Sequence, residues 1–212
     1  IALQGQGNVG FAAACNLGAA RAREPLLLLL NPDCLLPPAA LGGLLEQARE
    51  LTVPWLLGPR LLHPDGTEQA GSRRRVLTPG LAVVEGLGLY RLVPRLRRFN
   101  LHREPLPAKT VPVPVISGAC MLMPVAAYRR LGGMDEGYFL HLEDVDFCLR
   151  FGAMGGGVYF CPKPAVTHLK GTSAASPLMV EWHKTRGFLR YFHRHFRGRC
   201  LPGVLLLIDL LI

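Results

Sequence analysis

Paired cysteines are missing from this chain, and so are the Cys and His spacings that are typical of zinc sites. The six cysteines stand apart, and no two of them form a C-x-x-C pair. This spacing excludes a zinc ribbon and does not favour a disulfide scaffold in a chain of 212 residues. We therefore expect free thiols in a reducing compartment, and these are Cys15, Cys34, Cys120, Cys148, Cys161 and Cys200.

Long apolar runs are also missing. Residues 201–212 are mostly apolar, but Asp209 interrupts them, and a transmembrane helix needs about 20 apolar residues. We expect this segment to be either a buried helix or the start of a longer span. The chain shows no signal peptide and no initiator Met, so we also expect that its natural start is missing.

Acidic residues are scarce, because 15 Asp and Glu stand against 24 Lys and Arg, which gives a net charge of +9. Such a charge suggests an anionic partner: nucleic acid, a nucleotide-linked substrate or an acidic membrane surface. Nucleic acid is disfavoured, since the arginines do not interleave with stacking aromatics on a recognisable binding fold. A nicotinamide-dependent enzyme is disfavoured too, because no G-x-G-x-x-G motif follows the strand predicted at residues 26–30.

Strands and helices alternate in the first part of the chain. Residues 26–30 are five leucines that end in Asn-Pro-Asp, a pattern that predicts a central strand buried on both faces. Residues 10–23 and 38–51 have helical patterns, and residues 55–62 are a further strand candidate. This alternation predicts an α/β layer structure.

The remaining chain is less regular. Residues 71–112 are rich in Arg, Pro and Gly and predict a long surface excursion with a short helix near 81–92. Strand character returns at 111–123, a short helix is expected at 125–131, and short strands are expected at 158–160 and 165–168. A basic segment, 180–196, carries aromatic side chains at helical spacing. This amphipathic helix either packs on the core or lies on a membrane surface.

Three carboxylates, Glu143, Asp144 and Asp146, stand within a largely apolar and aromatic run. Burial of a carboxylate costs several kcal/mol unless it gains partners, and an apolar surround raises its pKa, as general acid–base chemistry requires. The alternative is an acidic helix N-terminus, where the same carboxylates complement the helix dipole. The run is therefore a candidate for chemistry, and Asp146, one step into the helix, is the member that we assign to capping or structure.

Three weaker signals lie elsewhere. Asp33 follows the apolar strand, at the edge where open α/β sheets bind ligands, and could hold a divalent cation or simply cap the next helix. His168 ends a short β-like segment and is either a metal ligand or a structural histidine. Asn8 and Gly10 precede the first helix, whose N–H groups suit an anion or nucleotide unless they form a plain turn.

The order of these segments carries more information than any one of them. Asn-x-Gly-Phe, Asn-Pro-Asp, Ser-Gly-Ala, Gly-Gly-Met-Asp-Glu, Glu-Asp-Val-Asp-Phe, a segment ending in His168 and Gly-x-Ser follow one another. This succession, from about residue 7 to 173, resembles the family 2 glycosyltransferases with the GT-A fold, and most closely their rhamnosyltransferase-like branch. The resemblance implies an α/β fold with a mixed, mostly parallel sheet flanked by helices.

The resemblance also implies roles for individual residues. Asp33 and His168 would hold a divalent cation, Mg²⁺ or Mn²⁺, that carries the diphosphate of a nucleotide-sugar donor. Asn31 would contact the sugar or ribose. Asp144 would be the general base that takes the acceptor's proton, and Glu143 would orient it or contact the acceptor.

The nucleotide pocket is the part that the resemblance leaves incomplete. Asn8, Gly10, Phe11 and Asn16 fall in the region that lines this pocket in the family. The family's opening strand and its Asp-x-x-Ser-x-Asp-type segment, which hold the base, have no counterpart here. We therefore expect that the first β-α unit of the fold is missing.

The expected function is inverting transfer of a rhamnose-like or other hexose from a nucleoside-diphosphate donor to a glycan or polyprenyl-linked acceptor, in surface polysaccharide synthesis. We expect a glycosyltransferase domain at 1–175, a basic amphipathic helix at 176–200 and an apolar segment at 201–212. The expected location is the cytoplasm, with peripheral attachment to the anionic inner face of the plasma membrane as one option. The alternatives are a basic nucleic-acid-binding module and a non-catalytic sugar-binding module.

Overall fold

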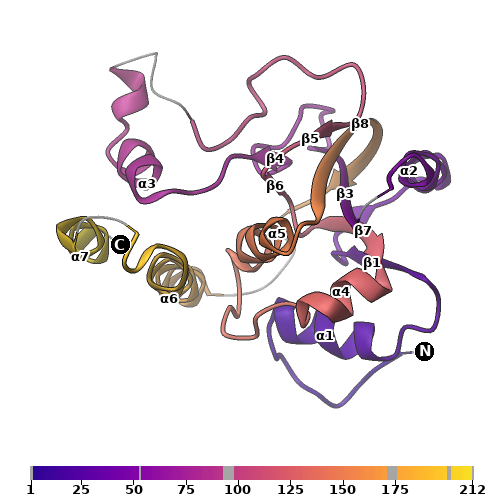
Figure 1. Cartoon of the computed structure of the whole chain (residues 1–212), viewed down its shortest axis with the longest axis horizontal. Helices are drawn as coiled ribbons and strands as arrows, with labels where there is room; N and C mark the ends of the chain where they lie inside the picture. The colour runs from indigo at the N-terminus through magenta and orange to yellow at the C-terminus, as the bar shows by residue number, and fades with distance from the viewer. Residues whose placement is uncertain (1, 53, 93–97, 171–175, 200–201, 212) are drawn as a thin grey trace.

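The computed structural model describes residues 2–52, 54–92, 98–170, 176–199 and 202–211, which form an α/β structure (Figure 1). Its main sheet has six strands in the order β1-β7-β3-β8-β2, and β5 also pairs with β8. A smaller sheet pairs two short strands, β4 with β6. The strands are β1 (Leu26–Leu30), β2 (Cys34–Leu35), β3 (Trp55–Leu62), β4 (Arg73–Arg74), β5 (Val111–Pro112), β6 (Val115–Ile116), β7 (Cys120–Pro124) and β8 (Gly157–His168).

The main sheet is mixed, as the sequence predicts. β3 and β8 pair in parallel, and β7 pairs antiparallel with both β1 and β3, so β1, β3 and β8 run in one direction. These three strands contain most of the strand residues. β7, β2 and β5 run the opposite way.

Two strand predictions need correction. β1 lies at one edge of the described sheet, where Leu30 is 38% exposed, and the central strand is β3. A run of leucines is compatible both with an edge strand that helices cover and with a strand flanked by other strands. It therefore does not predict where the strand lies in the sheet. The short strands expected at 158–160 and 165–168 are one strand, β8, whose register with β3 shifts between Pro59 and Arg60. The prolines at 162 and 164 concealed this continuity.

Helices cover both faces of the sheet, at positions close to those predicted. Figure 1 shows α2 on one side and α1, α4 and α5 on the other. The short helix in the excursion and the C-terminal helix are also present. The helices are α1 (Phe11–Ala20), α2 (Pro38–Arg49), α3 (Pro79–Gly86) with the 3₁₀ turn η1 (Leu89–Arg91), α4 (Val125–Leu131), α5 (Glu143–Ala153), α6 (Pro177–Phe196) and α7 (Pro202–Leu211).

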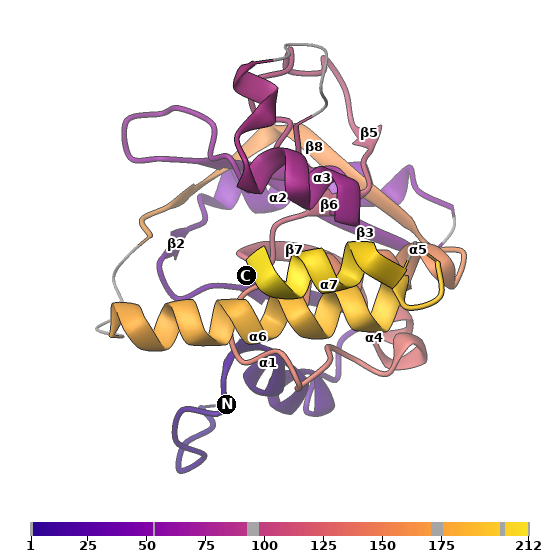
Figure 2. The same ribbon diagram turned by 90° about the vertical axis from the view of Figure 1, so that its left-hand side faces the viewer.

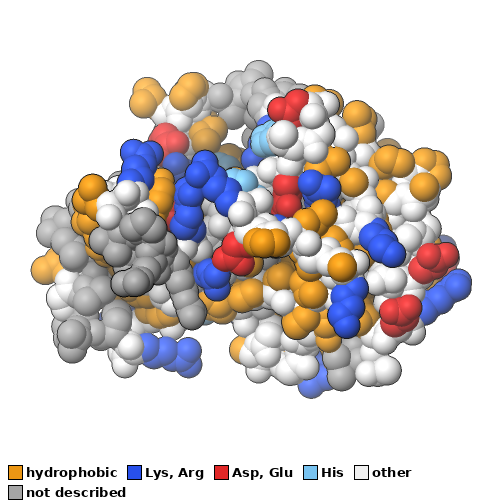
Figure 3. All heavy atoms as spheres, turned by 90° about the horizontal axis from the view of Figure 1, so that it is seen from above, with side chains coloured by type: hydrophobic (Ala, Val, Ile, Leu, Met, Phe, Trp, Pro, Cys, Tyr) orange, Lys and Arg blue, Asp and Glu red, His pale blue; other side chains and the backbone are white. Residues whose placement is uncertain are grey.

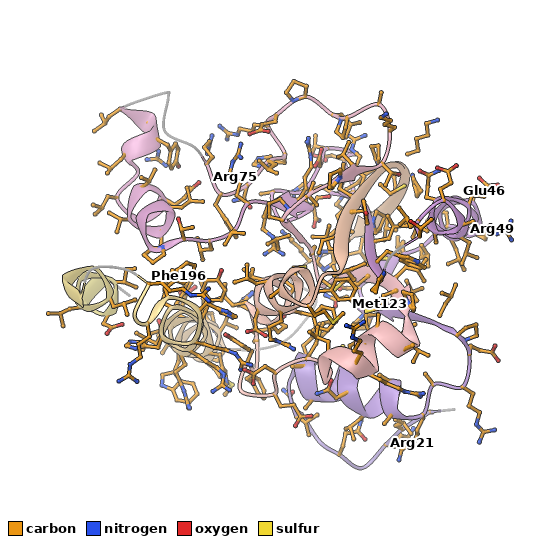
Figure 4. The ribbon with its side chains drawn as sticks, in the orientation of Figure 1. Arg21, Glu46, Arg49, Arg75, Met123 and Phe196 are labelled. Carbon is orange, nitrogen blue, oxygen red and sulfur yellow. The ribbon has the colours of Figure 1, made fainter. Side chains whose placement is uncertain are left out.

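The alternation of side chains along the strands divides the core between these two faces. Leu57 and Leu122 pack with Leu44 of α2, whereas Leu56 and Met123 pack with the larger cluster around α5. Figure 4 shows Met123 in the interior, with Glu46 and Arg49 on the outer side of α2. The large cluster holds α5, whose first turn carries the predicted catalytic carboxylates.

The basic helix α6 joins the main core, which confirms the first of its two predicted roles. Tyr191 and Phe192 are fully buried, and Phe188 and Phe196 pack against the same cluster. Figure 2 shows α7 lying along α6 with α3 beside them, and Ile208 of α7 is also buried. Among the described residues no helix is both long and apolar enough to span a membrane.

The cysteines of the described chain are free thiols, as expected, and are Cys15, Cys34, Cys120, Cys148 and Cys161. Cys200 and the Gly-x-Ser motif at 171–173 lie outside the described residues.

Candidate active site

The pairing of β2 with the end of β8 brings the two predicted metal ligands together. Cys34 lies opposite His168 in this antiparallel pair, and the Leu169 N–H donates to the Asp33 carbonyl at 2.9 Å. As a result, His168 Nε2 lies 3.2 Å from Asp33 Oδ1. Two residues that are far apart in the sequence are thus neighbours.

Gln69 orients the imidazole of His168, and the sequence offered no signal for it. Its side chain is buried, its Oε1 lies 3.0 Å from His168 Nδ1, and its Nε2 donates to the His168 carbonyl at 2.6 Å. Because the amide oxygen only accepts, we assign the proton to Nδ1, which leaves the Nε2 lone pair facing Asp33. Metal-binding histidines are commonly oriented by such a hydrogen bond from the ring nitrogen that does not bind the metal.

The geometry of Asp33 and His168 fits a divalent cation. A nitrogen lone pair and a carboxylate oxygen 3.2 Å apart repel each other unless a proton or a cation lies between them. Burial lowers the pKa of His168, although the Asp33 charge opposes this, so the neutral imidazole is favoured. Ligand atoms at adjacent corners of an octahedral Mg²⁺ site lie about 3.0 Å apart. The pair therefore has the spacing of two adjacent ligands.

Cys34 flanks this pair but is a poor ligand for such a cation. The ligand atoms of Asp33, Cys34 and His168 all lie within 4.8 Å of one another. The Cys34 thiol donates to the Ala119 carbonyl at 3.4 Å, and burial, followed by the Asp33 charge, raises its pKa to about 11. A protonated thiol does not suit a cation that prefers oxygen.

We call Asp33 and His168 the cation pair, because together they would hold one divalent cation. The Ser-Gly-Ala segment, residues 117–119, joins this pair to the acidic run. The Ala119 carbonyl accepts from the Asn31 N–H at 2.9 Å, and the N–H of the preceding residue, Gly118, donates to Asp144 Oδ2 at 2.9 Å. The Asn31 Oδ1 atom is buried and has no hydrogen-bond partner among the described residues. A buried acceptor of this kind calls for a polar ligand or a water molecule.

Asp144 is held by three donors at the first turn of α5. Besides Gly118, the Val145 N–H donates to Oδ1 at 2.8 Å, and Arg74 Nη2 donates to Oδ2 at 2.6 Å. A Cβ atom on Gly118 would lie 3.1 Å from the Asp144 Cβ and 3.4 Å from the Phe11 ring. Glycine at 118 therefore permits the close approach of the carboxylate to the sheet.

The two carboxyl groups titrate in opposite directions. Burial would raise the pKa of Asp144, but the Arg74 charge and the three hydrogen bonds outweigh it and hold the pKa below its usual value. Burial, followed by the Asp144 charge, raises the pKa of Glu143 to about 8. The Glu143 Oε2 atom is buried without a hydrogen-bond partner in the described part of the chain. The prediction that an apolar surround raises the pKa is thus right for Glu143 and wrong for Asp144.

Arg74 is the main residue that the sequence did not identify, since it stood only as one member of a basic triplet. Its guanidinium also donates to the Ile116 carbonyl at 2.9 Å and lies 5.7 Å from the Phe99 ring centroid. The neighbouring Arg73 instead pairs with Glu68 at 2.8 Å. Because side chains alternate along β4, only one of these two arginines reaches the carboxylates.

A strained turn precedes the carboxylates. His141 and Leu142 both have a φ of 68°, which lies in the left-handed region, although neither is a glycine. Such backbone is uncommon for bulky residues and persists only when the surroundings hold it. α6 supplies part of that support, because a Cβ atom on Gly187 would lie 3.3 Å from the His141 carbonyl oxygen.

The predicted nucleotide-binding residues at the start of α1 form a tight turn. The Asn8 Oδ1 accepts from the Gly10 N–H at 3.3 Å, and the Phe11 N–H donates to the Phe139 carbonyl at 3.1 Å. Gly10 has φ of 84°, and a Cβ atom there would lie 2.7 Å from that same carbonyl oxygen. Two of the N–H groups that we expected to face a ligand are therefore occupied, while the Phe11 ring lies beside Gly118.

The side-chain amide of Asn16 is hydrogen-bonded within the protein. Its Oδ1 accepts from the Tyr128 hydroxyl at 2.5 Å and the Met134 N–H at 3.0 Å, and its Nδ2 donates to the Met134 carbonyl and Glu136. A Cβ atom on Gly133 would lie 2.4 Å from Asn16 Oδ1. These contacts favour a role in packing α1 against residues 128–136 over the predicted contact with donor.

Asp146 also has a structural environment, as we assigned it from the sequence. Its side chain is fully buried and accepts from Arg150 Nε and from His195 Nε2, each at 2.7 Å. Burial alone would raise its pKa, but the His195 hydrogen bond and the Arg150 charge hold the pKa below its usual value. The contact joins the first turn of α5 to α6.

Positive charge surrounds the carboxylates and the cation pair. Burial, with Arg74 as the next cause, lowers the pKa of Lys170, which follows the end of β8. Burial also lowers the pKa of His141, where Lys184 and Arg74 act in the same direction against Asp144. Figure 3 shows Lys and Arg side chains grouped with a few acidic and His side chains on one face. This field suits a ligand with several negative charges.

Comparison with known proteins identifies a family. Residues 2–198 match the family described as "Glycosyltransferase like family 2". An N-acetylglucosaminyl-diphospho-decaprenol L-rhamnosyltransferase of Mycobacterium tuberculosis is 31% identical over 204 residues, which cover 88% of this chain and 65% of that protein. This chain therefore spans less than two thirds of that relative.

Two solved structures share the GT-A fold. GalNAc-T7, crystallised with UDP, GalNAc and Mn²⁺, aligns with a TM-score of 0.54 at 15% identity over 99% of this chain and 42% of its own. The mannosyltransferase PcManGT of Pyrobaculum calidifontis, in complex with GDP-Man and Mn²⁺, aligns with a TM-score of 0.50 at 15% identity, over 95% of this chain and 48% of its own.

Proposed function

Because the chain belongs to the family described as glycosyltransferase like family 2, we propose that it transfers a hexose, rhamnose or a similar sugar, from a nucleoside-diphosphate donor to a lipid-linked glycan acceptor. The observation that carries this proposal is the pairing of Asp33 with His168, linked through Ala119 and Gly118 to Asp144. The turn that carries Asp33 and the carboxylate of Asp144 are hydrogen-bonded to adjoining backbone residues, Ala119 and Gly118. Transfer from a diphosphate needs a cation and a base brought together in this way. The rhamnosyltransferase relative supports the choice of sugar and acceptor.

In this proposal Asp33 and His168 would hold Mn²⁺ or Mg²⁺, with Gln69 fixing the imidazole. The cation would supply neutralisation of the departing nucleoside diphosphate. The two solved structures support Mn²⁺ as the first metal to test, since both contain it. Lys170 and Arg74 add positive charge on the same side, and Asn31 offers a buried acceptor to a sugar or ribose hydroxyl.

The proposed reaction is a single displacement that inverts the anomeric carbon. Asp144 takes the proton of an acceptor hydroxyl as that oxygen bonds to the anomeric carbon from the face opposite the diphosphate. The bond from that carbon to the diphosphate oxygen breaks, and its electron pair leaves with the nucleoside diphosphate. Arg74 keeps Asp144 ionised, so that its carboxylate is free of a proton when the acceptor binds, although the lowered pKa makes it a weaker base. Glu143, protonated near neutral pH, would donate a hydrogen bond to the acceptor.

The test of this proposal is Asp144→Asn in the complete gene product. We expect transfer to fall by about 10²–10⁴-fold, because the base is lost, while donor binding with Mn²⁺ is retained. Glu46→Gln is the matched control, since this carboxylate lies on the outer side of α2 (Figure 4). Unchanged turnover in Asp144→Asn would refute the base, and a product of retained anomeric configuration would refute the single displacement.

We also propose that the protein works at the anionic cytoplasmic surface of a membrane, where a lipid-linked acceptor would lie. The first half of α6 supports this, because Trp182 is 52% exposed and Arg186 lies 4.5 Å from its ring centroid. Exposed Trp beside Arg and Lys is typical of helices at a membrane interface. Salt-sensitive binding to anionic liposomes is expected, and absence of binding at low salt would contradict it.

A further inference from the structure

The loop that joins α4 to α5 leads directly into the first turn of α5, where Glu143 and Asp144 lie. We call its residues 135–142 the entry loop. Figure 1 shows the chain between α4 and α5 reaching toward α6. The entry loop ends in His141 and Leu142, whose left-handed backbone must be held by its surroundings. The placement of Asp144 therefore depends on what holds the entry loop.

One face of α6 follows the entry loop. The imidazole of His183 stacks on the ring of Phe139, with ring centroids 4.1 Å apart. Gly187 lies about one turn further along α6, and a Cβ atom there would be 3.3 Å from the His141 carbonyl oxygen and 3.6 Å from Leu142 Cδ1. The first of these distances is tighter than ordinary van der Waals contact. The helix thus reaches the strained turn because residue 187 carries no side chain.

The same face of α6 holds the beginning of the entry loop by charge. Arg190 Nη2 lies 2.9 Å from Asp135 Oδ1, and Arg194 pairs with the other oxygen of this largely buried carboxylate. A Cβ atom on Gly137 would overlap the Arg190 guanidinium, so the loop backbone and the guanidinium are in direct contact. Positions 183, 187, 190 and 194 recur at intervals of three and four, which places them on one side of a helix. One stripe of α6 is therefore matched to the whole entry loop.

A second helix, α1, holds the entry loop at Phe139. The Phe11 N–H donates to the Phe139 carbonyl at 3.1 Å, and a Cβ atom on Gly10 would lie 2.7 Å from the same oxygen. The Phe11 ring lies beside Gly118, whose N–H donates to Asp144. The entry loop is thus fixed by two helices, and a shift of the loop would change the surroundings of the carboxylate.

We propose that α6 is a positioning element of the active site, with Gly187 as the positioning residue that lets it reach the entry loop. This inference rests on the proposed function, to which it adds a determinant of the position of the base. Gly187 acts through the turn at His141 and Leu142. A side chain at 187 would push this turn away from α6 and move Asp144 relative to its hydrogen-bond donors. The cation pair lies outside this chain of contacts, because the pairing of β2 with β8 holds it.

The test is Gly187→Ala, with Gly152→Ala in α5 as the matched control. Both changes replace a helical glycine by a better helix former, but a Cβ atom on Gly152 would have no neighbour within 4 Å beyond its own helix backbone. For Gly187→Ala we expect kcat to fall on the order of tenfold, because a small displacement of a catalytic group is costly. Affinity for the nucleotide sugar with Mn²⁺ should be unchanged, and Gly152→Ala should match the parent in both respects. Parent-like kcat in Gly187→Ala, or an equal loss of donor affinity, would overturn the proposal.

A second measurement does not depend on turnover. The N–H groups of Gly118 and Val145 both donate to Asp144, so their hydrogen exchange, followed by NMR in the complete protein, reports on the position of the carboxylate. Exchange at both should be faster in Gly187→Ala than in the parent. Unchanged exchange at both would overturn the positioning role even if transfer is lost. Faster exchange in a protein that transfers no sugar would keep the positioning role and refute the proposed function.

A second variant weakens the contact with α6 without adding a side chain. Asp135→Asn removes the charge that Arg190 and Arg194 bind, while the amide oxygen can still accept from the Gly137 N–H, as Asp135 Oδ1 does at 2.9 Å. We expect kcat to fall severalfold with donor affinity unchanged. Glu136→Gln is the control, because this exposed carboxylate hydrogen-bonds to α1 instead. Equal kcat in the two variants would overturn the role of α6 and reduce the effect at 187 to local packing.

Discussion

The cation pair and the carboxylate pair of the candidate site are held in place by different means. Backbone pairing between β2 and β8 sets Asp33 against His168, and the neutral Gln69 adjusts the imidazole. Asp144 depends instead on the charge of Arg74, a side chain from the long excursion after β3. One half of the site is thus built by the sheet, and the other by an ion pair that is mostly buried.

This difference predicts how each half responds to change. Loss of a ligand from the cation pair should remove metal-dependent donor binding and leave the sheet intact, because the strand pairing needs no side-chain charge. Loss of the Arg74 charge beside Asp144 should change both the free energy of unfolding and the pKa of Asp144, because a buried carboxylate needs its partner. Variants of the two halves should therefore fail in separable ways.

Asp33→Asn is expected to have the largest effect. The amide removes the negative charge that would hold the cation, so Mn²⁺-dependent binding of the nucleotide sugar should be lost, and turnover should fall on the order of 10³-fold. Calorimetric titration of donor with and without Mn²⁺ measures this. Asp144→Asn should keep that binding, so equal donor affinity in the two variants would contradict the division of the site.

Arg74→Met should come next. Removal of one partner from this pair costs about 3 kcal/mol of unfolding free energy near neutral pH, because Asp144 stays buried without its cation. The sign follows from the pKa: in the parent the lowered pKa of Asp144 stabilises the fold above about pH 4, and this stability is lost as pH falls through the folded pKa. The deficit of the variant should therefore shrink at acid pH.

Urea unfolding at neutral and acid pH checks the Arg74 prediction, and the pH profile of turnover should shift upward in the same variant. Arg75→Met is the neighbouring control, because its pair with Glu104 is exposed and contributes about 0–1 kcal/mol. An equal deficit at both pH values would show that Arg74 stabilises the fold by packing alone.

In both halves the reactive residues could be predicted from the sequence, whereas the side chains that hold them could not. The motifs that contain Asp33 and Asp144 follow a recognisable order, and the alternation of apolar runs predicts the α/β layers. The partners could not be predicted, because Gln69 lies in an irregular segment and Arg74 lies in a strand of two residues, which is too short to give a recognisable sequence period. The edge position of β1 was hidden for a related reason, since five leucines are equally suited to an edge covered by helices.

The sequence also could not predict that the pKa of Glu143 is raised while that of Asp144 is lowered. Glu143 and Asp144 are adjacent, yet the helix turns their side chains to different surroundings, one to Arg74 and the other to an apolar enclosure. A local pattern can report that carboxylates are buried. It cannot report that Arg74 pairs with Asp144 and not with Glu143.

Glu143→Gln should have the smallest effect on turnover and a clear effect on stability. With its pKa raised to about 8, Glu143 is protonated near pH 7, so an amide of the same shape should reduce turnover only severalfold there. The folded state holds this proton more tightly than the unfolded state, so the parent should lose stability as pH rises from about 4.5 toward 8, by at most about 1.4 kcal/mol per pH unit. The variant should lack this slope, and Glu136→Gln, an exposed carboxylate, should keep it. Parallel stability profiles for the parent and Glu143→Gln would show that Glu143 is ionised in the fold.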